Sequence, residues 1–153
     1  MSTPKRYRED SLDGLLPGFR PVVERILGRM SALGFDCVVF DALRTPEEAL
    51  QNAAKGTGIV NSIHCYGAAV DIICNRHGWS CKAKRCKFYL ALQRCAEAEG
   101  CVSGAHFKSV DLPHVQAVPV GTWQNRVRAC GLGNVEAANA VVLAYRRTLP
   151  KVA

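Results

Sequence analysis

The sequence predicts an α+β fold in which a small, mostly antiparallel sheet packs against helices. Apolar residues recur at helical spacing in several segments, and short β-branched or aromatic runs lie between them. No internal repeat or low-complexity linker divides the chain. Its 153 residues, with 48% hydrophobic content, suit one domain with a sizeable core. We therefore expect an N-terminal arm over residues 1–18 and a single domain over residues 19–153.

The first half of the chain predicts two helices and one strand, over residues 21–33, 46–55 and 35–42 respectively. In the first helix, Pro21 suits the first turn and Gly34 the C-terminal end. The strand is rich in β-branched and aromatic residues, which favour a pleated, buried position. Thr45 is expected to cap the second helix, with Glu48 completing a capping box.

The second half predicts three strands, over residues 69–74, 101–103 and 114–118, and three helices, over residues 87–99, 122–129 and 135–147. The polar segment 75–87 contains five lysine or arginine residues, and we expect it at the surface. Gly100 ends the first of these helices, and Asn134 is expected to cap the last.

Three residues have side chains that suit a metal ion, namely His64, Asp71 and His114. His64 and Asp71 are too far apart for neighbouring turns of one helix, so they must approach each other through a turn at Gly67 and a returning strand. A surface histidine and a strand-end carboxylate are the alternative from spacing alone. Two histidines and one carboxylate leave an open position on a tetrahedral zinc, as in catalytic zinc sites.

Asp111 precedes the third candidate ligand by three residues. Pro113 favours an extended conformation at Leu112, so the segment should enter a strand with His114 at its start. Asp111 would then lie near the open metal position without binding the metal, where it would accept a proton from water. The alternative is a loop aspartate that caps local backbone amides.

Two motifs carry a resemblance to a known family. Ser62, His64, Gly67, Ala69 and Asp71 fill a Ser-x-His-x-x-Gly-x-Ala-x-Asp pattern, and Asp111 with His114 forms a downstream Asp-x-x-His. From about residue 35 to 116, the chain resembles the zinc peptidases that cut peptidoglycan stem peptides. These include VanY-like D-alanyl-D-alanine carboxypeptidases and the L-alanyl-D-glutamate endopeptidases of phage endolysins. The resemblance implies the hedgehog/DD-peptidase fold, a zinc cofactor and a single zinc peptidase domain over residues 19–153.

The resemblance also implies roles for individual residues. Asp111 would be the general base and later the proton donor to the leaving amine. Arg44 would hold the developing oxyanion or the substrate carboxylate, although an ion pair with Glu47 or Glu48 is an alternative. Ser62 would hydrogen-bond the substrate backbone or stabilise its own turn. His106 stands in a segment where many relatives carry Gly-Gly-x-Trp, and we expect it to face the substrate or line the cleft.

The expected function is hydrolysis of an amide bond in peptidoglycan by an endolysin-type L-alanyl-D-glutamate endopeptidase. A D-alanyl-D-alanine carboxypeptidase of the same fold is one alternative. A zinc-containing binding module without catalysis is another, and Asp111 argues against it because such a module needs no base.

Charge and composition set expectations about partners and location. The net charge of +7 favours attraction to anionic polymers such as those of the cell envelope. Nucleic acid is not an expected partner, because aromatic content is 7% and no stacking motif is present. No secretory signal or transmembrane segment is recognisable, so we expect cytoplasmic synthesis, with action at the bacterial wall after release or export by another factor. We expect a monomer.

The chain has eight cysteines, which is many for its length. Cys74, His77, Cys81 and Cys86 have ligand types for a second, structural zinc, but a Cys81–Cys86 disulfide or free thiols are alternatives. Elsewhere, buried free cysteines behave as small hydrophobic residues, and we expect this of Cys37, Cys95 and Cys130.

Overall fold

A computed structural model describes residues 4–56, 61–79 and 87–151 of the chain. It contains a four-stranded antiparallel sheet with the order β1-β2-β4-β3. The strands are β1 (Cys37–Asp41), β2 (Ala69–Cys74), β3 (Val102–Ser103) and β4 (His114–Gln116). The helices are α1 (Arg20–Ala32), α2 (Pro46–Ala54), α3 (Phe88–Ala98), α4 (Thr122–Ala129) and α5 (Val135–Thr148). The predicted α+β fold class is thereby confirmed.

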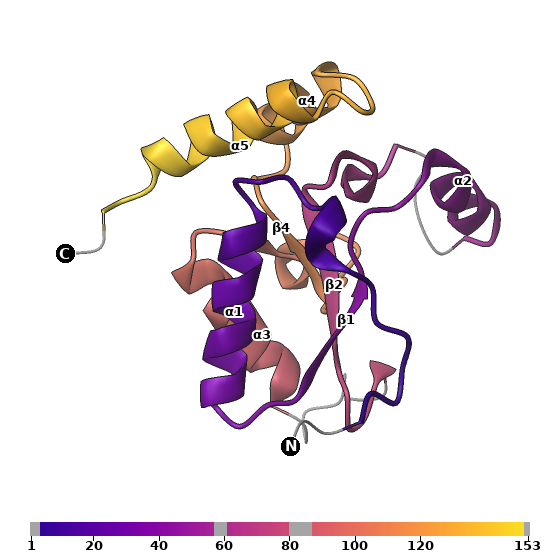
Figure 1. Cartoon of the computed structure of the whole chain (residues 1–153), viewed down its shortest axis with the longest axis vertical. Coiled ribbons are helices and arrows are strands. Elements are labelled where there is room, and N and C mark those ends of the chain that lie inside the picture. Colours follow the sequence, from indigo (N-terminus) through magenta and orange to yellow (C-terminus); the bar gives the residue numbers. More distant parts are fainter. Residues whose placement is uncertain (1–3, 57–60, 80–86, 152–153) are drawn as a thin grey trace.

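The main core lies between the sheet and the pair α1 and α3, which lie side by side (Figure 1). Val70 and Ile72 of β2 and Val115 of β4 belong to this core, together with Ile26 of α1 and Leu92 of α3. Because successive side chains of a strand point to opposite faces, the residues between them point away from this core. The other face of the sheet is therefore free to carry polar side chains.

The helices α4 and α5 pack against each other at one end of the molecule (Figure 1). Trp123 and Tyr145 pair edge to face, with their ring centroids 5.5 Å apart. The Tyr145 hydroxyl donates to the carbonyl oxygen of Gly100 at 3.1 Å, which ties α5 to the end of α3. This contact fixes the pair of helices to the sheet domain, close to the strand that carries His114.

The predicted elements agree with the structure to within a few residues at each end. The Thr45 hydroxyl accepts a hydrogen bond from the backbone N–H of Glu48, and Asn134 caps α5 in the same way. At the end of the predicted arm, Leu15 and Leu16 are buried in the core. Ahead of α1, this segment therefore contributes apolar contacts to the domain.

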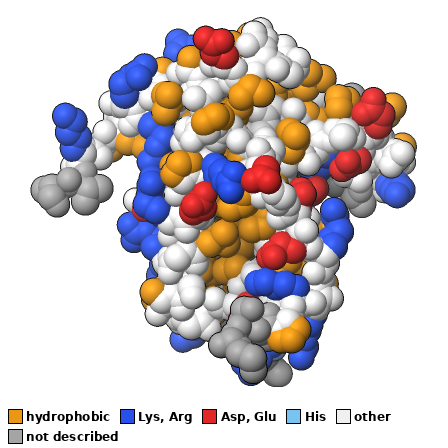
Figure 2. Space-filling view, viewed as in Figure 1, with side chains coloured by type: hydrophobic (Ala, Val, Ile, Leu, Met, Phe, Trp, Pro, Cys, Tyr) orange, Lys and Arg blue, Asp and Glu red, His pale blue; other side chains and the backbone are white. Residues whose placement is uncertain are grey.

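Both basic and acidic side chains are distributed over the surface. Figure 2 shows lysine and arginine along several edges of one face, with acidic side chains between them. Among the described residues, no helix has the length and apolar character required to cross a membrane.

Candidate active site

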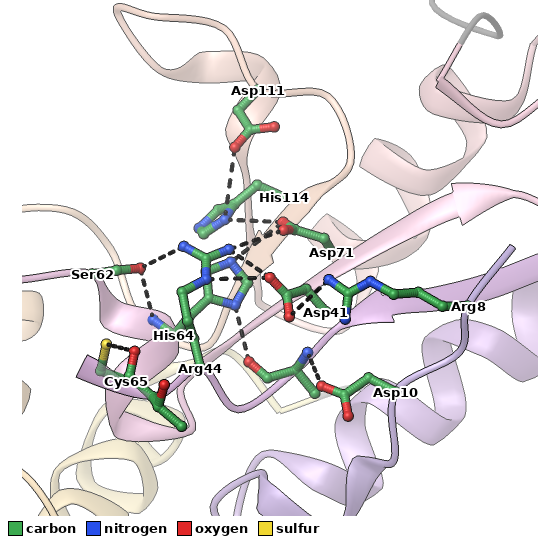
Figure 3. Close-up of polar contacts among 12 residues, drawn as sticks. Arg8, Asp10, Asp41, Arg44, Ser62, His64, Cys65, Asp71, Asp111 and His114 are labelled. Carbon is green, nitrogen blue, oxygen red and sulfur yellow. Dashed lines mark hydrogen bonds and ion pairs between the residues drawn. The ribbon is translucent and has the colours of Figure 1, made fainter. Parts of the chain in front are cut away.

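Three neighbouring strands bring polar side chains into one row across the sheet. Asp71 of β2 pairs with Asp41 of β1 on one side and with His114 of β4 on the other. All three side chains are buried and lie on the face away from the main core. The strand pairing therefore places one predicted ligand directly beside another, as Figure 3 shows.

His64 reaches the same place from a short 3-10 turn over Ile63–Tyr66. The Ser62 hydroxyl caps this turn by accepting a hydrogen bond from the backbone N–H of His64 at 3.2 Å. Gly67 ends it with a φ of 72°, a left-handed conformation that glycine adopts without a steric penalty. A Cβ at Gly67 would also meet the Gly14 carbonyl oxygen at 2.7 Å. The predicted turn and returning strand are thus present.

The three predicted ligands converge on one point. The Nε2 atom of His64 lies 3.3 Å from Oδ1 of Asp71, and Nδ1 of His114 lies 3.5 Å from the same oxygen. One possible ligand atom from each residue lies within 4.8 Å of the other two. Two imidazole nitrogens and a carboxylate oxygen are the donor set that zinc takes in catalytic sites.

Hydrogen bonds at the outer edge of the two rings fix which nitrogens face inward. Nδ1 of His64 lies 3.0 Å from the carbonyl oxygen of Ala42, and Nε2 of His114 lies 2.9 Å from Oε1 of Gln116. Both partners are acceptors, so these ring nitrogens carry the protons. In the neutral form of each ring the inward nitrogen is then unprotonated, and it faces Asp71 Oδ1, which is buried without a hydrogen bond from any described residue. Three lone-pair donors around one space fit a cation.

The orientation of Gln116 is itself determined by its neighbours. Its side-chain nitrogen donates to the Val118 carbonyl oxygen and to Oε1 of Gln124, both at 2.7 Å. The amide oxygen must therefore be the atom that faces His114. Metal-binding histidines commonly depend on such an outer acceptor for their tautomer and ring orientation. Sequence analysis did not identify Gln116, although its position two residues after His114, on the same face of β4, was a usable signal.

The electrostatics of the site favour positive charge. Burial alone would raise the pKa of Asp71, but the neighbouring His64 and His114 outweigh burial and hold that pKa well below its ordinary value. Burial alone would lower the pKa of His114, but its contacts with Asp71 outweigh burial and raise that pKa. The cluster therefore holds an ionised carboxylate in a buried place, which a bound cation would neutralise.

Arg44 lies at the edge of this cluster and is itself buried. Its guanidinium donates to Asp41 Oδ2 at 2.7 Å and lies 3.6 Å from Asp71 Oδ2 and 3.4 Å from the Ser62 hydroxyl (Figure 3). The ion pairs of Arg44 within the described chain are thus with these two aspartates, not with Glu47 or Glu48. Sequence analysis missed Asp41, whose place at a strand end three residues before an arginine was the available signal.

Asp111 is half exposed and stands on the solvent side of the cluster. Its Oδ2 atom lies 4.0 Å from Nδ1 of His114, too far for a hydrogen bond. Close packing of Gly104 fixes the loop, since a Cβ there would collide with the Asp111 carbonyl oxygen. Asp111 therefore flanks the three candidate ligands without joining them.

The cluster opens into a cleft of about 1070 Å³. His106 is one of the residues that line this cleft. It is exposed, and its Nε2 lies 2.6 Å from Oε1 of Glu97. Phe40 and Trp79 form an edge-to-face pair along another part of the lining. The space is large enough for a peptide segment beside the three ligands.

The predicted cysteine cluster is only partly described. Cys81 and Cys86 lie outside the described residues, and Cys74 is a buried free cysteine. Cys37, Cys95 and Cys130 are free as expected; Cys95 is buried and the other two are half-buried. Burial raises the pKa of the Cys37 thiol to about 12, which keeps it protonated and unreactive.

Comparison with known proteins bears on the same segment. A family model described as D-alanyl-D-alanine carboxypeptidase matches residues 55–117. The resemblance to the VanY-like zinc peptidases is confirmed. The matched residues 55–117 include the three candidate ligands, Asp111 and Gln116, whereas Arg44 lies outside this range.

One solved structure supports the fold. It is the L-Ala D-Glu endopeptidase ChiX of Serratia marcescens, which is 23% identical with a TM-score of 0.50 over 69% of this chain and 81% of its own. At this identity the likeness shows a shared fold. Among curated proteins, none matches the chain.

Proposed function

We propose that the protein is a zinc-dependent peptidase that hydrolyses an amide bond in peptidoglycan stem peptides, as an L-alanyl-D-glutamate endopeptidase of the endolysin type. The observation that carries this proposal is the convergence of three possible ligand atoms, from His64, Asp71 and His114, on the wall of an open cleft. The match to a D-alanyl-D-alanine carboxypeptidase family and the fold shared with an L-Ala D-Glu endopeptidase support a peptidoglycan peptide as substrate.

In this proposal, His64, Asp71 and His114 hold zinc. The ion would supply Lewis-acid polarisation of the scissile carbonyl and would lower the pKa of water. Asp111 accepts the proton of the attacking water and later passes it to the leaving amine, which its half-exposed position beside the ligands permits. By accepting a hydrogen bond from the outer ring nitrogens, Ala42 and Gln116 select the tautomer of the neutral imidazoles whose inward nitrogens can bind a metal.

Arg44 stabilises the negative charge that develops on the substrate oxygen. Asp41 orients its guanidinium by accepting two of its N–H groups, at 2.7 and 3.2 Å. A preorganised charged donor of this kind lowers the barrier because it needs no rearrangement during the reaction. Ser62 caps the His64 turn and contacts Arg44, so a direct role toward substrate is secondary to its positioning role.

A D-alanyl-D-alanine carboxypeptidase is the second candidate, because the matching family model carries that description. The two activities differ in the bond that they cleave and share the zinc chemistry. Mass spectrometry of digested muropeptides distinguishes them directly. New L-alanine C-termini identify the endopeptidase, whereas release of free D-alanine identifies the carboxypeptidase.

A binding module without catalysis is tested in the same assay. Wild type and Asp111→Asn are incubated with purified cell walls, each with and without a chelator. We expect wild type to release soluble peptides only without chelator, and the variant to release almost none while still binding zinc. Zinc binding without any release by wild type would favour the binding module, and equal release by the variant would remove Asp111 as base.

A further inference from the structure

The face of α4 that looks toward the candidate site carries a second polar residue besides Gln124. The side chain of Gln124 accepts a hydrogen bond from Gln116, which shows that Gln124 lies on that face. Arg128 follows it by four residues, which places both on the same side of the helix. Both line the cleft that contains His64 and His114. Arg128 is thus one helical turn farther along the wall of the cleft than Gln124, which contacts Gln116 beside the candidate metal site.

Part of the Arg128 guanidinium is removed from water without gaining a hydrogen bond from the described part of the protein. Its Nε atom is buried and has no hydrogen-bond acceptor among the described residues. The other cleft arginines are different in this respect. Arg44 is bound to Asp41, and Arg8 lies 3.7 Å from Asp41 and stacks on Phe40 at 4.2 Å. Among the described residues, no carboxylate pairs with Arg128, and the half-buried side chain lines the cleft, so its terminal N–H groups can reach an anionic group of a ligand there.

A role in the helix alone does not account for this position. A basic residue in the last turn favours the helix dipole, and α4 has two, Arg126 and Arg128. Arg126 is exposed and stacks on Trp123 at 4.7 Å. Arg126 is therefore an exposed residue that stacks on its own helix, whereas Arg128 lines the cleft.

We propose that Arg128 is a specificity-determining residue that binds a free carboxylate of the peptide substrate. A guanidinium offers parallel N–H groups that match the two oxygens of a carboxylate. The identity of the substrate rests on the proposed function. Glutamate has two carboxyl groups and only one enters the peptide bond, so a stem peptide that contains D-glutamate has a free carboxylate on that residue and another at the C-terminus. Either would supply the acceptor.

The test uses synthetic peptides of L-Ala, D-Glu and L-Lys with the zinc-loaded full chain; lysine is joined to the γ-carboxyl group of D-glutamate, which leaves its α-carboxylate free. One peptide has both carboxylates free, one has the D-glutamate α-carboxylate as an amide, and one has an amidated C-terminus. Each is assayed with wild type, Arg128→Gln and the matched control Arg126→Gln. Peptide binding is measured separately by calorimetry with Asp111→Asn in each background, so that a readout exists without turnover.

We expect Arg128→Gln to raise KM, and the dissociation constant, by roughly 10- to 100-fold for the free peptide, the range for loss of one charge-assisted hydrogen bond. The value of kcat should change little, and Arg126→Gln should behave as wild type. One amidated peptide should bind wild type as weakly as Arg128→Gln, which identifies the carboxylate. Arg128→Lys should recover only part of the affinity, because lysine lacks the planar fork.

Equal affinity of Arg128→Gln and wild type for the free peptide would overturn the inference, as would an equal loss for all three peptides. If wild type binds the free peptide through Arg128 but never cleaves it, the subsite stands and the proposed peptidase activity fails. If wild type binds none of the peptides, the subsite is overturned for this substrate class. Thermal melts of all variants establish that each is folded.

Discussion

The Nε2 atom of His114 lies 2.9 Å from Oε1 of Gln116, whose own amide nitrogen is held by two further acceptors. The chain of contacts runs from the metal-facing ring to α4 through Gln124. It fixes the proton of His114 on the outer nitrogen and leaves the inner one free to bind a metal. The orientation of His114 therefore depends on a residue outside the three candidate ligands.

Replacement of Gln116 should weaken zinc binding more than stability. We expect Gln116→Leu to lower zinc affinity by about 10- to 100-fold, as is common when an outer partner of a ligand is lost. Gln116→Glu keeps an acceptor for His114 and should retain most of the affinity. Competition with a chromophoric chelator measures both, and Gln93→Leu on α3 is the surface control. Equal affinity in Gln116→Leu and wild type would contradict the assigned role.

A methyl group at Gly104 should disturb the loop that carries Asp111. The added Cβ would collide with the Asp111 carbonyl oxygen and approach the Cβ of His114 to 3.0 Å. We expect Gly104→Ala to reduce kcat by at least tenfold, because small displacements of a proton acceptor have large effects on rate. Gly28→Ala is the matched control. No atom lies within 4 Å of its added Cβ, so it should gain about 0.5–1 kcal/mol of stability and keep full activity. An equally active Gly104→Ala would contradict this prediction.

Glu99 should make stability depend on pH. Its carboxylate accepts from Arg25 at 2.6 Å and from Arg29 at 2.9 Å, joining the end of α3 to α1. Burial alone would raise the pKa of Glu99, but the two arginines outweigh burial and lower it. The carboxylate therefore stabilises the fold above its ordinary pKa of 4.5, and this contribution disappears as the pH falls through the lowered value.

Replacement of Glu99 tests that linkage. We expect Glu99→Gln to lose on the order of 1 kcal/mol of unfolding free energy at pH 7, and little near pH 2. Urea unfolding across the pH range provides the measurement. Glu97→Gln, which breaks an exposed pair with His106, should cost less than Glu99→Gln at pH 7. A loss that stays constant down to pH 2 would exclude a role of the charge.

Arg44 should contribute to the reaction and not to metal binding. Arg44→Lys keeps a positive charge but cannot maintain both contacts with Asp41, so we expect kcat to fall by about 10²-fold with zinc content unchanged. Asp41→Asn should show a smaller loss of the same kind, because it loosens the orientation of the guanidinium. Steady-state kinetics and metal analysis of the same samples distinguish these effects. Loss of zinc from Arg44→Lys would show that Arg44 acts on the metal ligands instead.

Much of the fold was predictable because local signals agreed with tertiary structure. The strand 69–74 and the helix 122–129 were predicted with their observed limits, since apolar patterning and end signals coincided there. The three candidate ligands were recognisable from their residue types and the two paired motifs. Antiparallel pairing of β2 and β4 then brings Asp71 and His114 together. Short strands bounded by turn residues, as predicted here, are compatible with such pairing.

The supporting residues were not predictable in the same way. Asp41 and Gln116 have ordinary residue types in strands. Their spacing from Arg44 and His114 was a weak signal, and the pairing of β1, β2 and β4 is what places them beside the ligands. Arg128 lies on a helix whose sequence gives no sign that one face lines the cleft. Such roles arise from contacts between distant segments, which a local pattern does not contain.

We propose that His64, Asp71 and His114 together bind one zinc ion. X-ray absorption at the zinc edge, on protein loaded with one equivalent, tests it most directly. We predict a first shell of nitrogen and oxygen at about 2.0–2.2 Å, with the outer scattering of two imidazole rings, and its loss in Asp71→Ala. A sulfur shell at about 2.3 Å that persists in Asp71→Ala would contradict the account and place the metal on the cysteines.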